Sequence, residues 1–185
     1  MRLTAGETRI EVSFWFVAVP AILLNVTPGL DPLICFCFCI LHEIGHLAAM
    51  YVFGCAPEKI EFGYFGMRID EGAAMLKTSY EVLTAAAGPA VSLTLAAVLY
   101  LYGFRYAAGV NAALGLFNLL PVPMLDMGRI ITALTGGGVV LRRVGTAVCV
   151  ALTAAGAALA VYSRRNFTLL AVSLYLLSGT LRGRE

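Results

Sequence analysis

The sequence predicts an all-α polytopic membrane protein with about six transmembrane helices and a short membrane-associated β-hairpin or strand after the second helix. Two observations predict this class: hydrophobic residues make up 60% of the 185 residues while charged residues make up 13%, and the mean hydropathy is +0.86. Soluble domains are nearer to about 45–50% apolar and 25% charged. The net charge of +2 is too small to indicate a nucleic-acid partner, so we expect the lipid bilayer to surround the chain.

The expected spans are apolar segments separated by polar, glycine-rich or proline-rich stretches. They cover residues 12–26, 33–53, 81–102, 106–121, 139–162 and 167–181. A transmembrane helix needs roughly 20 residues, so the first and last segments are short. Pro32 precedes the second segment, where a helix start tolerates proline. The first segment lacks a small-residue cleavage pattern, so we expect it to be a retained span and not a signal peptide.

The distribution of basic residues predicts that both termini lie in the cytoplasm. With six spans, ten basic residues fall on the side of the termini: Arg2, Arg9, Lys59, Arg68, Lys77, Arg129, Arg142, Arg143, Arg182 and Arg184. Three fall on the other side: Arg105, Arg164 and Arg165. Cytoplasmic segments of membrane proteins carry the excess of Lys and Arg. The second and fourth segments then run inward, which would bring His46 and Asp126 to similar depths.

Residues 58–64, between the second and third spans, alternate between apolar and other side chains. The apolar positions are Ile60, Phe62 and Tyr64. A period of two is typical of a β-strand, and residues 65–70 could continue this strand or return along it. An amphipathic loop on the bilayer surface is the alternative.

An H-E-x-x-H motif at residues 42–46 lies inside the second segment and contains both histidines of the chain. On a helix, His42 and His46 share one face, displaced by roughly 6 Å along the axis, and can bind one zinc ion at about 2.0–2.1 Å each. Glu43 would take a proton from water beside the metal. Ionisable residues in membrane helices are costly, which favours a functional site. The alternative is a hydrogen-bonded histidine pair near the helix end, with Glu43 at the interface.

A hydrolytic zinc site needs a third protein ligand and an open position. Asp126 is the best candidate, since it follows an apolar segment and two prolines, Pro121 and Pro123. These prolines break the helix and free backbone carbonyls, which membrane proteins tolerate only within protein or beside a water-filled cavity. An ordinary interfacial turn residue is the alternative reading of Asp126.

The cysteines indicate neither a disulfide framework nor a zinc finger, because their number is odd and no C-x-x-C pair is present. The five are Cys35, Cys37, Cys39, Cys55 and Cys149. Cys35, Cys37 and Cys39 alternate within the second segment, and we expect them to be small hydrophobic helix residues, with metal ligation or redox work as the alternative.

Three segments, in this order, resemble the site-2 proteases, a family of zinc intramembrane peptidases. They are H-E-I-G-H at residues 42–46, A-G-P at residues 87–89, and N-L-L-P-V-P-M-L-D at residues 118–126. The compact layout is most similar to the branch that contains stage IV sporulation protein FB. The resemblance implies one domain over residues 1–185, with its core at about 33–135 and no PDZ or CBS domain, in a bacterial cell membrane.

The resemblance also implies roles for single residues. His42, His46 and Asp126 would bind one zinc ion per chain, and Glu43 would be the catalytic base. Other residues would contact the substrate: Asn118 and Pro121 near the reacting bond, and Ile60, Phe62 and Tyr64 in an edge strand that holds an unwound segment by strand addition. Two positions depart from the family pattern, since Met127 replaces a glycine and Ser92 stands where asparagine is frequent.

The function that these residues imply is cleavage of a transmembrane or membrane-associated protein by a zinc metalloendopeptidase. Pro-sigma factors, anti-sigma factors and signal-peptide remnants are substrates by family analogy, and a membrane regulatory partner would fit. Two other classes remain open: a membrane metal carrier that uses the same ligands, and a relative that binds membrane proteins without cutting them. A carrier would not need Glu43 as a base.

Overall fold

The computed structural model describes residues 2–5, 8–14, 16, 18, 21–22, 29–55, 57–63, 66–70, 77–164 and 167–182. The chain divides into two compact units, residues 1–116 and 117–185. Among the described residues, the first unit contains a small sheet and most of three helices, and the second contains three helices. The predicted helical class is therefore confirmed for the described residues.

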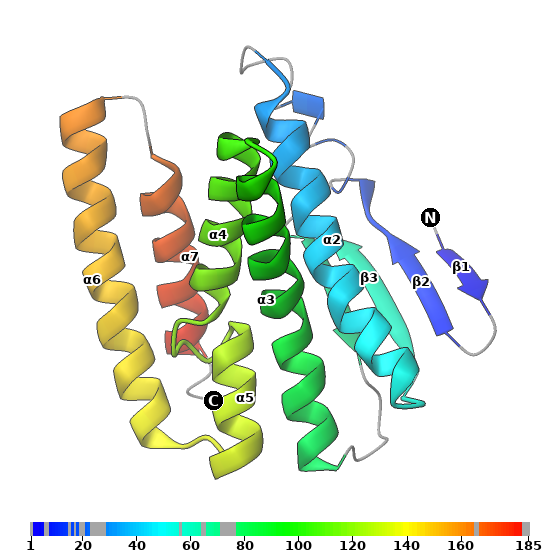
Figure 1. Cartoon of the computed structure of the whole chain (residues 1–185). Coiled ribbons are helices and arrows are strands. Elements are labelled where there is room, and N and C mark those ends of the chain that lie inside the picture. The colour runs from blue at the N-terminus through cyan, green and yellow to red at the C-terminus, as the bar shows by residue number, and fades with distance from the viewer. Residues whose placement is uncertain are drawn as a thin grey trace. The chain divides into compact units, whose positions relative to one another are not determined.

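Two long helices form the centre of the first unit. They are α2, Asp31–Val52, and α3, Thr78–Leu101, which pack side by side (Figure 1). A Cβ at Gly45 of α2 would lie 3.0 Å from the carbonyl oxygen of Ala87, so glycine at this position lets the two backbones approach closely. The third helix, α4, spans Arg105–Asn118 and reaches the boundary of the unit.

A four-stranded sheet completes the first unit. Its strands are β1 (Arg2–Ala5), β2 (Thr8–Val12), β3 (Lys59–Gly63) and β4 (Gly66–Asp70), in the order β1-β2-β3-β4. The β2–β3 pair is parallel, and the β1–β2 and β3–β4 pairs are antiparallel. The strand expected after the second helix is thus confirmed. The sequence does not predict the two N-terminal strands, because residues 2–12 lead directly into the first apolar segment.

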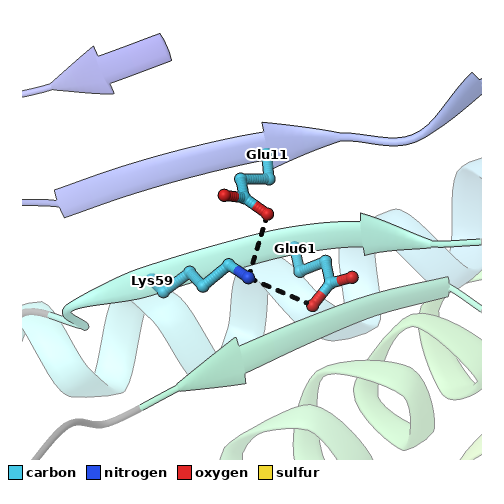
Figure 2. A network of polar contacts seen from close by, with 3 residues as sticks. All are labelled: Glu11, Lys59 and Glu61. Carbon is cyan, nitrogen blue, oxygen red and sulfur yellow. Dashed lines mark hydrogen bonds and ion pairs between the residues drawn. The ribbon is translucent and has the colours of Figure 1, made fainter. Parts of the chain in front are cut away.

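Strand β3 has a charged face and an apolar face, as the alternation of residues 58–64 predicts. On the charged face, Lys59 forms ion pairs with Glu11 at 2.9 Å and with Glu61 at 3.5 Å (Figure 2). The hydrogen bond with Glu11 raises the pKa of Lys59 above its usual value. On the other face, Ile60 is buried, and the ring of Phe62 packs on Phe16 at 4.9 Å between centroids.

The second unit contains α5, Asp126–Thr135, α6, Val139–Ser163, and α7, Thr168–Arg182. α6 and α7 pack against each other (Figure 1). The core of this unit is small and apolar, and its buried residues are Val122, Leu125, Cys149 and Leu176. The short helix α5 was not predicted. Gly136 caps its C-terminal end and adopts the left-handed conformation with φ of 74°.

Three of the described helices are long and apolar enough to cross a membrane: α2, α3 and α6. α4 and α7, with 14 and 15 residues, are shorter than an ordinary span. The first expected span, residues 12–26, lies largely outside the described residues, although its first residue, Val12, belongs to β2. The prediction of six spans therefore stays a prediction.

Candidate metal centre

Both histidines lie on the face of α2 that is covered by protein. The buried residues of α2 are His42, Gly45, His46 and Met50, which recur at the spacing of one helix face. His42 is 3% exposed and His46 is 2% exposed. Because burial of a polar ring without partners is costly, each imidazole requires hydrogen bonds.

The Nδ1 atom of each histidine meets a polar group of α3. His46 Nδ1 lies 2.8 Å from the carbonyl oxygen of Thr84. A carbonyl can only accept, so His46 Nδ1–H is the donor, and the neutral ring keeps its lone pair at Nε2. His42 Nδ1 lies 2.9 Å from the hydroxyl of Ser92, which can accept in the same way.

The two Nε2 atoms lie 3.3 Å apart. An ion bound tetrahedrally, at about 2.0–2.1 Å from each nitrogen, would require a separation of roughly 3.3–3.4 Å. The histidine pair therefore fits zinc in both ligand type and spacing.

Gly88 of α3 faces the same two nitrogen atoms. A Cβ at this position would overlap His46 Nε2 and would lie 2.7 Å from His42 Nε2. Real Cβ atoms essentially never come this close to other heavy atoms. Any side chain at residue 88 would thus fill the space next to both ligand atoms, which explains why glycine occupies this position.

Gly88, which faces the two histidine nitrogen atoms, lies deep along α3, a helix that is long enough to span a membrane. Gly88 is ten residues after Thr78 and thirteen before Leu101, the ends of α3. At 1.5 Å per residue, these separations correspond to about 15 Å and 20 Å. A group at this position would lie well inside a hydrocarbon core of about 30 Å.

Glu43 follows His42 on α2 and is half-buried. One residue of an α-helix corresponds to a rotation of about 100°, so its carboxylate projects from the flank of the histidine face. This position suits a group that exchanges protons beside a metal and does not ligate it.

Asp126 belongs to the second unit and begins α5, where it is 7% exposed. The partial positive charge of a helix N-terminus favours a carboxylate. Gly128, in the same turn, allows close packing, because a Cβ there would overlap the carbonyl oxygen of Val122 and lie 2.7 Å from Cα of Pro123. The proline-containing segment and the first turn of α5 thus fix the backbone at Asp126.

The ligand chemistry of the predicted triad fits a metal ion. His42 and His46 of the first unit and Asp126 of the second unit are all buried. Two imidazoles and one carboxylate form a ligand set that zinc uses in hydrolases.

The predicted substrate-binding residues lie in different environments. Asn118, which ends α4, and Pro121 are half-buried. Ile60 and Phe62 belong to β3, which was predicted to be an edge strand. That prediction is wrong, because β3 pairs with β2 on one side and with β4 on the other. Their side chains pack within the unit. Tyr64 lies outside the described residues.

Sequence reasoning missed the role of one face of α3. Thr84, Gly88 and Ser92 are spaced by four residues, so they lie in a row, opposite the histidines of α2. The spacing was visible in the sequence, but the pairing of this row with His42 and His46 depends on helix packing. In the sequence, Gly88 stands out only as part of the A-G-P segment.

Comparison with known proteins identifies the fold. No protein-family model matches the chain, and no curated protein matches it either. Among solved structures, the chain is similar to the site-2 protease from Methanocaldococcus jannaschii, with a TM-score of 0.66 and 24% sequence identity. The similarity covers 98% of this chain and 94% of that chain. The chain therefore has the fold of that site-2 protease over nearly its whole length.

Proposed function

We propose that the chain is a zinc-dependent intramembrane endopeptidase of the site-2 protease type, which cleaves a transmembrane or membrane-tethered protein. The observation that carries this proposal is the pair of buried Nε2 atoms, 3.3 Å apart, deep along helices that could cross a membrane. His42 and His46 supply two zinc ligands and Asp126 supplies the third. The similarity in fold supports the same reading.

The residues divide the chemistry between them. Zinc, when bound by the triad, supplies Lewis acidity that makes water a stronger nucleophile near neutral pH. Glu43 accepts the proton of the attacking water and donates it to the leaving amine. The hydrogen bonds that the two imidazoles donate to α3 orient the rings so that their Nε2 lone pairs face the ion. Asn118 and Pro121 lie near the substrate in this proposal.

A substrate helix hides its peptide bonds in backbone hydrogen bonds, so it must unwind locally before cleavage. Addition of the unwound segment to the sheet as an extra strand could hold it. β3 cannot accept this strand, because β2 and β4 already pair with both of its edges. We therefore assign this role to the outer edge of β4, Gly66–Asp70, which ends the strand order of the described sheet.

Replacing Asp126 by alanine should abolish stoichiometric zinc binding, because two imidazoles alone leave the site short of a protein ligand. Metal analysis of the purified chain measures this directly. Asp31→Ala is the matched control, since Asp31 is an exposed aspartate in the first turn of α2. Equal zinc in Asp126→Ala and the wild type would assign the third ligand to another acid, with Glu61, Asp70 and Glu71 to be tested next.

We propose that the chain is a multi-pass protein of a bacterial cell membrane, with both termini in the cytoplasm. Within the site-2 proteases, we propose that it is most similar to the branch of stage IV sporulation protein FB and that it has a membrane regulatory partner. A reporter fused after Glu185 should therefore be active only if it functions in the cytoplasm. A matching fusion in the loop between α3 and α4, at Gly103, should report the opposite side. A reporter after Glu185 that is active only outside the cytoplasm would contradict the six-span topology.

A further inference from the structure

Ser92 is the buried hydroxyl that meets His42. Its side chain is 0% exposed, and its Oγ lies 2.9 Å from His42 Nδ1. Ser92 is four residues beyond Gly88 and eight beyond Thr84, on the face of α3 that meets both histidines.

The contact between Ser92 and His42 determines which nitrogen of the His42 ring carries the proton. A neutral imidazole that binds a metal through Nε2 must carry its proton on Nδ1. For His46, the carbonyl of Thr84 enforces this tautomer, and no side-chain substitution removes a backbone carbonyl. For His42, the corresponding acceptor is the hydroxyl of Ser92, so its tautomer and ring orientation depend on a side chain.

We infer that Ser92 is a positioning residue of the metal centre, whose Oγ accepts the Nδ1–H of His42 and so directs the Nε2 lone pair toward zinc. This inference rests on the proposed zinc centre. Ser92 touches neither the substrate nor the ion, and it acts only through His42. Loss of such an outer partner typically lowers metal affinity by about 10–100-fold.

The first test compares zinc affinities in a titration against a competing chelator. Ser92→Ala should bind zinc roughly 10–100-fold more weakly than the wild type. Ser173→Ala is the matched control, because Ser173 is also a 0%-exposed helical serine, and its hydroxyl donates to the carbonyl of Leu170 in α7. Ser173→Ala should keep wild-type affinity. Circular dichroism verifies that each variant is folded.

Rescue by threonine separates the hydrogen bond from packing. Ser92→Thr keeps the hydroxyl and should bind zinc more tightly than Ser92→Ala. If Ser92→Thr loses as much affinity as Ser92→Ala, the hydroxyl is not what matters, and the inference is overturned.

A spectroscopic test uses the small number of histidines. The chain has two, so NMR of the zinc-loaded protein with ¹⁵N-labelled histidine reports only His42 and His46. In Ser92→Ala, the Nδ1–H signal of His42 should shift as its hydrogen bond is lost, while that of His46 should stay in place. Equal changes at both rings would indicate general loosening and overturn the inference.

The outcomes also separate the two proposals. Zinc bound equally well by the wild type and Ser92→Ala would overturn only the role of Ser92. A wild-type chain that binds no zinc would overturn the zinc centre, and the role of Ser92 with it.

Discussion

A Glu43→Gln chain should bind zinc as the wild type does, but it should cleave peptide bonds about 10²–10⁴-fold more slowly, the usual contribution of a positioned general base. Glutamine keeps the size and polarity of the side chain but cannot take a proton from water. Co-expression with a candidate membrane-tethered substrate, followed by quantification of the cut and uncut forms, measures the loss. A proteomic comparison of Glu43→Gln and wild-type cells would reveal natural substrates as accumulating uncut proteins.

Glu58→Gln is the matched control for this experiment, because Glu58 is exposed and immediately precedes β3. It should leave both zinc content and cleavage unchanged. Full cleavage by a zinc-loaded Glu43→Gln chain would contradict the assigned mechanism. A membrane metal carrier would instead keep its transport activity in Glu43→Gln, so a transport assay on the same variant separates the two classes.

Gly88→Ala should remove bound zinc altogether and abolish cleavage with it. The added methyl group would overlap His46 Nε2 and lie 2.7 Å from His42 Nε2, so either the rings or α3 must move. Movement of the rings breaks the spacing of about 3.3–3.4 Å that tetrahedral zinc requires. Elemental analysis of the purified variant measures the effect.

Gly109→Ala is the control for the same substitution elsewhere in a helix. Gly109 lies in α4, and nothing lies within 4 Å of the position that its Cβ would take. Alanine in a helix is favoured over glycine by roughly 0.5–1 kcal/mol, so Gly109→Ala should keep its zinc and lose no stability. Wild-type zinc affinity in Gly88→Ala would show that the space beside the two nitrogen atoms is not the metal site.

Local patterns in the sequence predicted the parts of the structure that depend on local interactions. The spacing of His42 and His46 placed two ligands on one helix face, and long apolar segments indicated α2, α3 and α6. The alternation around Ile60 likewise indicated β3.

Features that depend on distant segments could not be read in the same way. Parallel pairing joins Arg9 of β2 to Lys59 of β3, fifty residues later, and it makes β3 an inner strand. The ten-residue helix α5 is too short to appear as a span. The contact of Ser92 with His42 requires the packing of α2 on α3.

The zinc content of the purified wild-type chain tests the central claim most directly. Elemental analysis should find about one zinc ion per chain, as a catalytic site with three protein ligands predicts, and almost none in a chain that carries both His42→Ala and His46→Ala. A wild-type chain without zinc, or a double variant that keeps its zinc, would contradict the proposed metal centre.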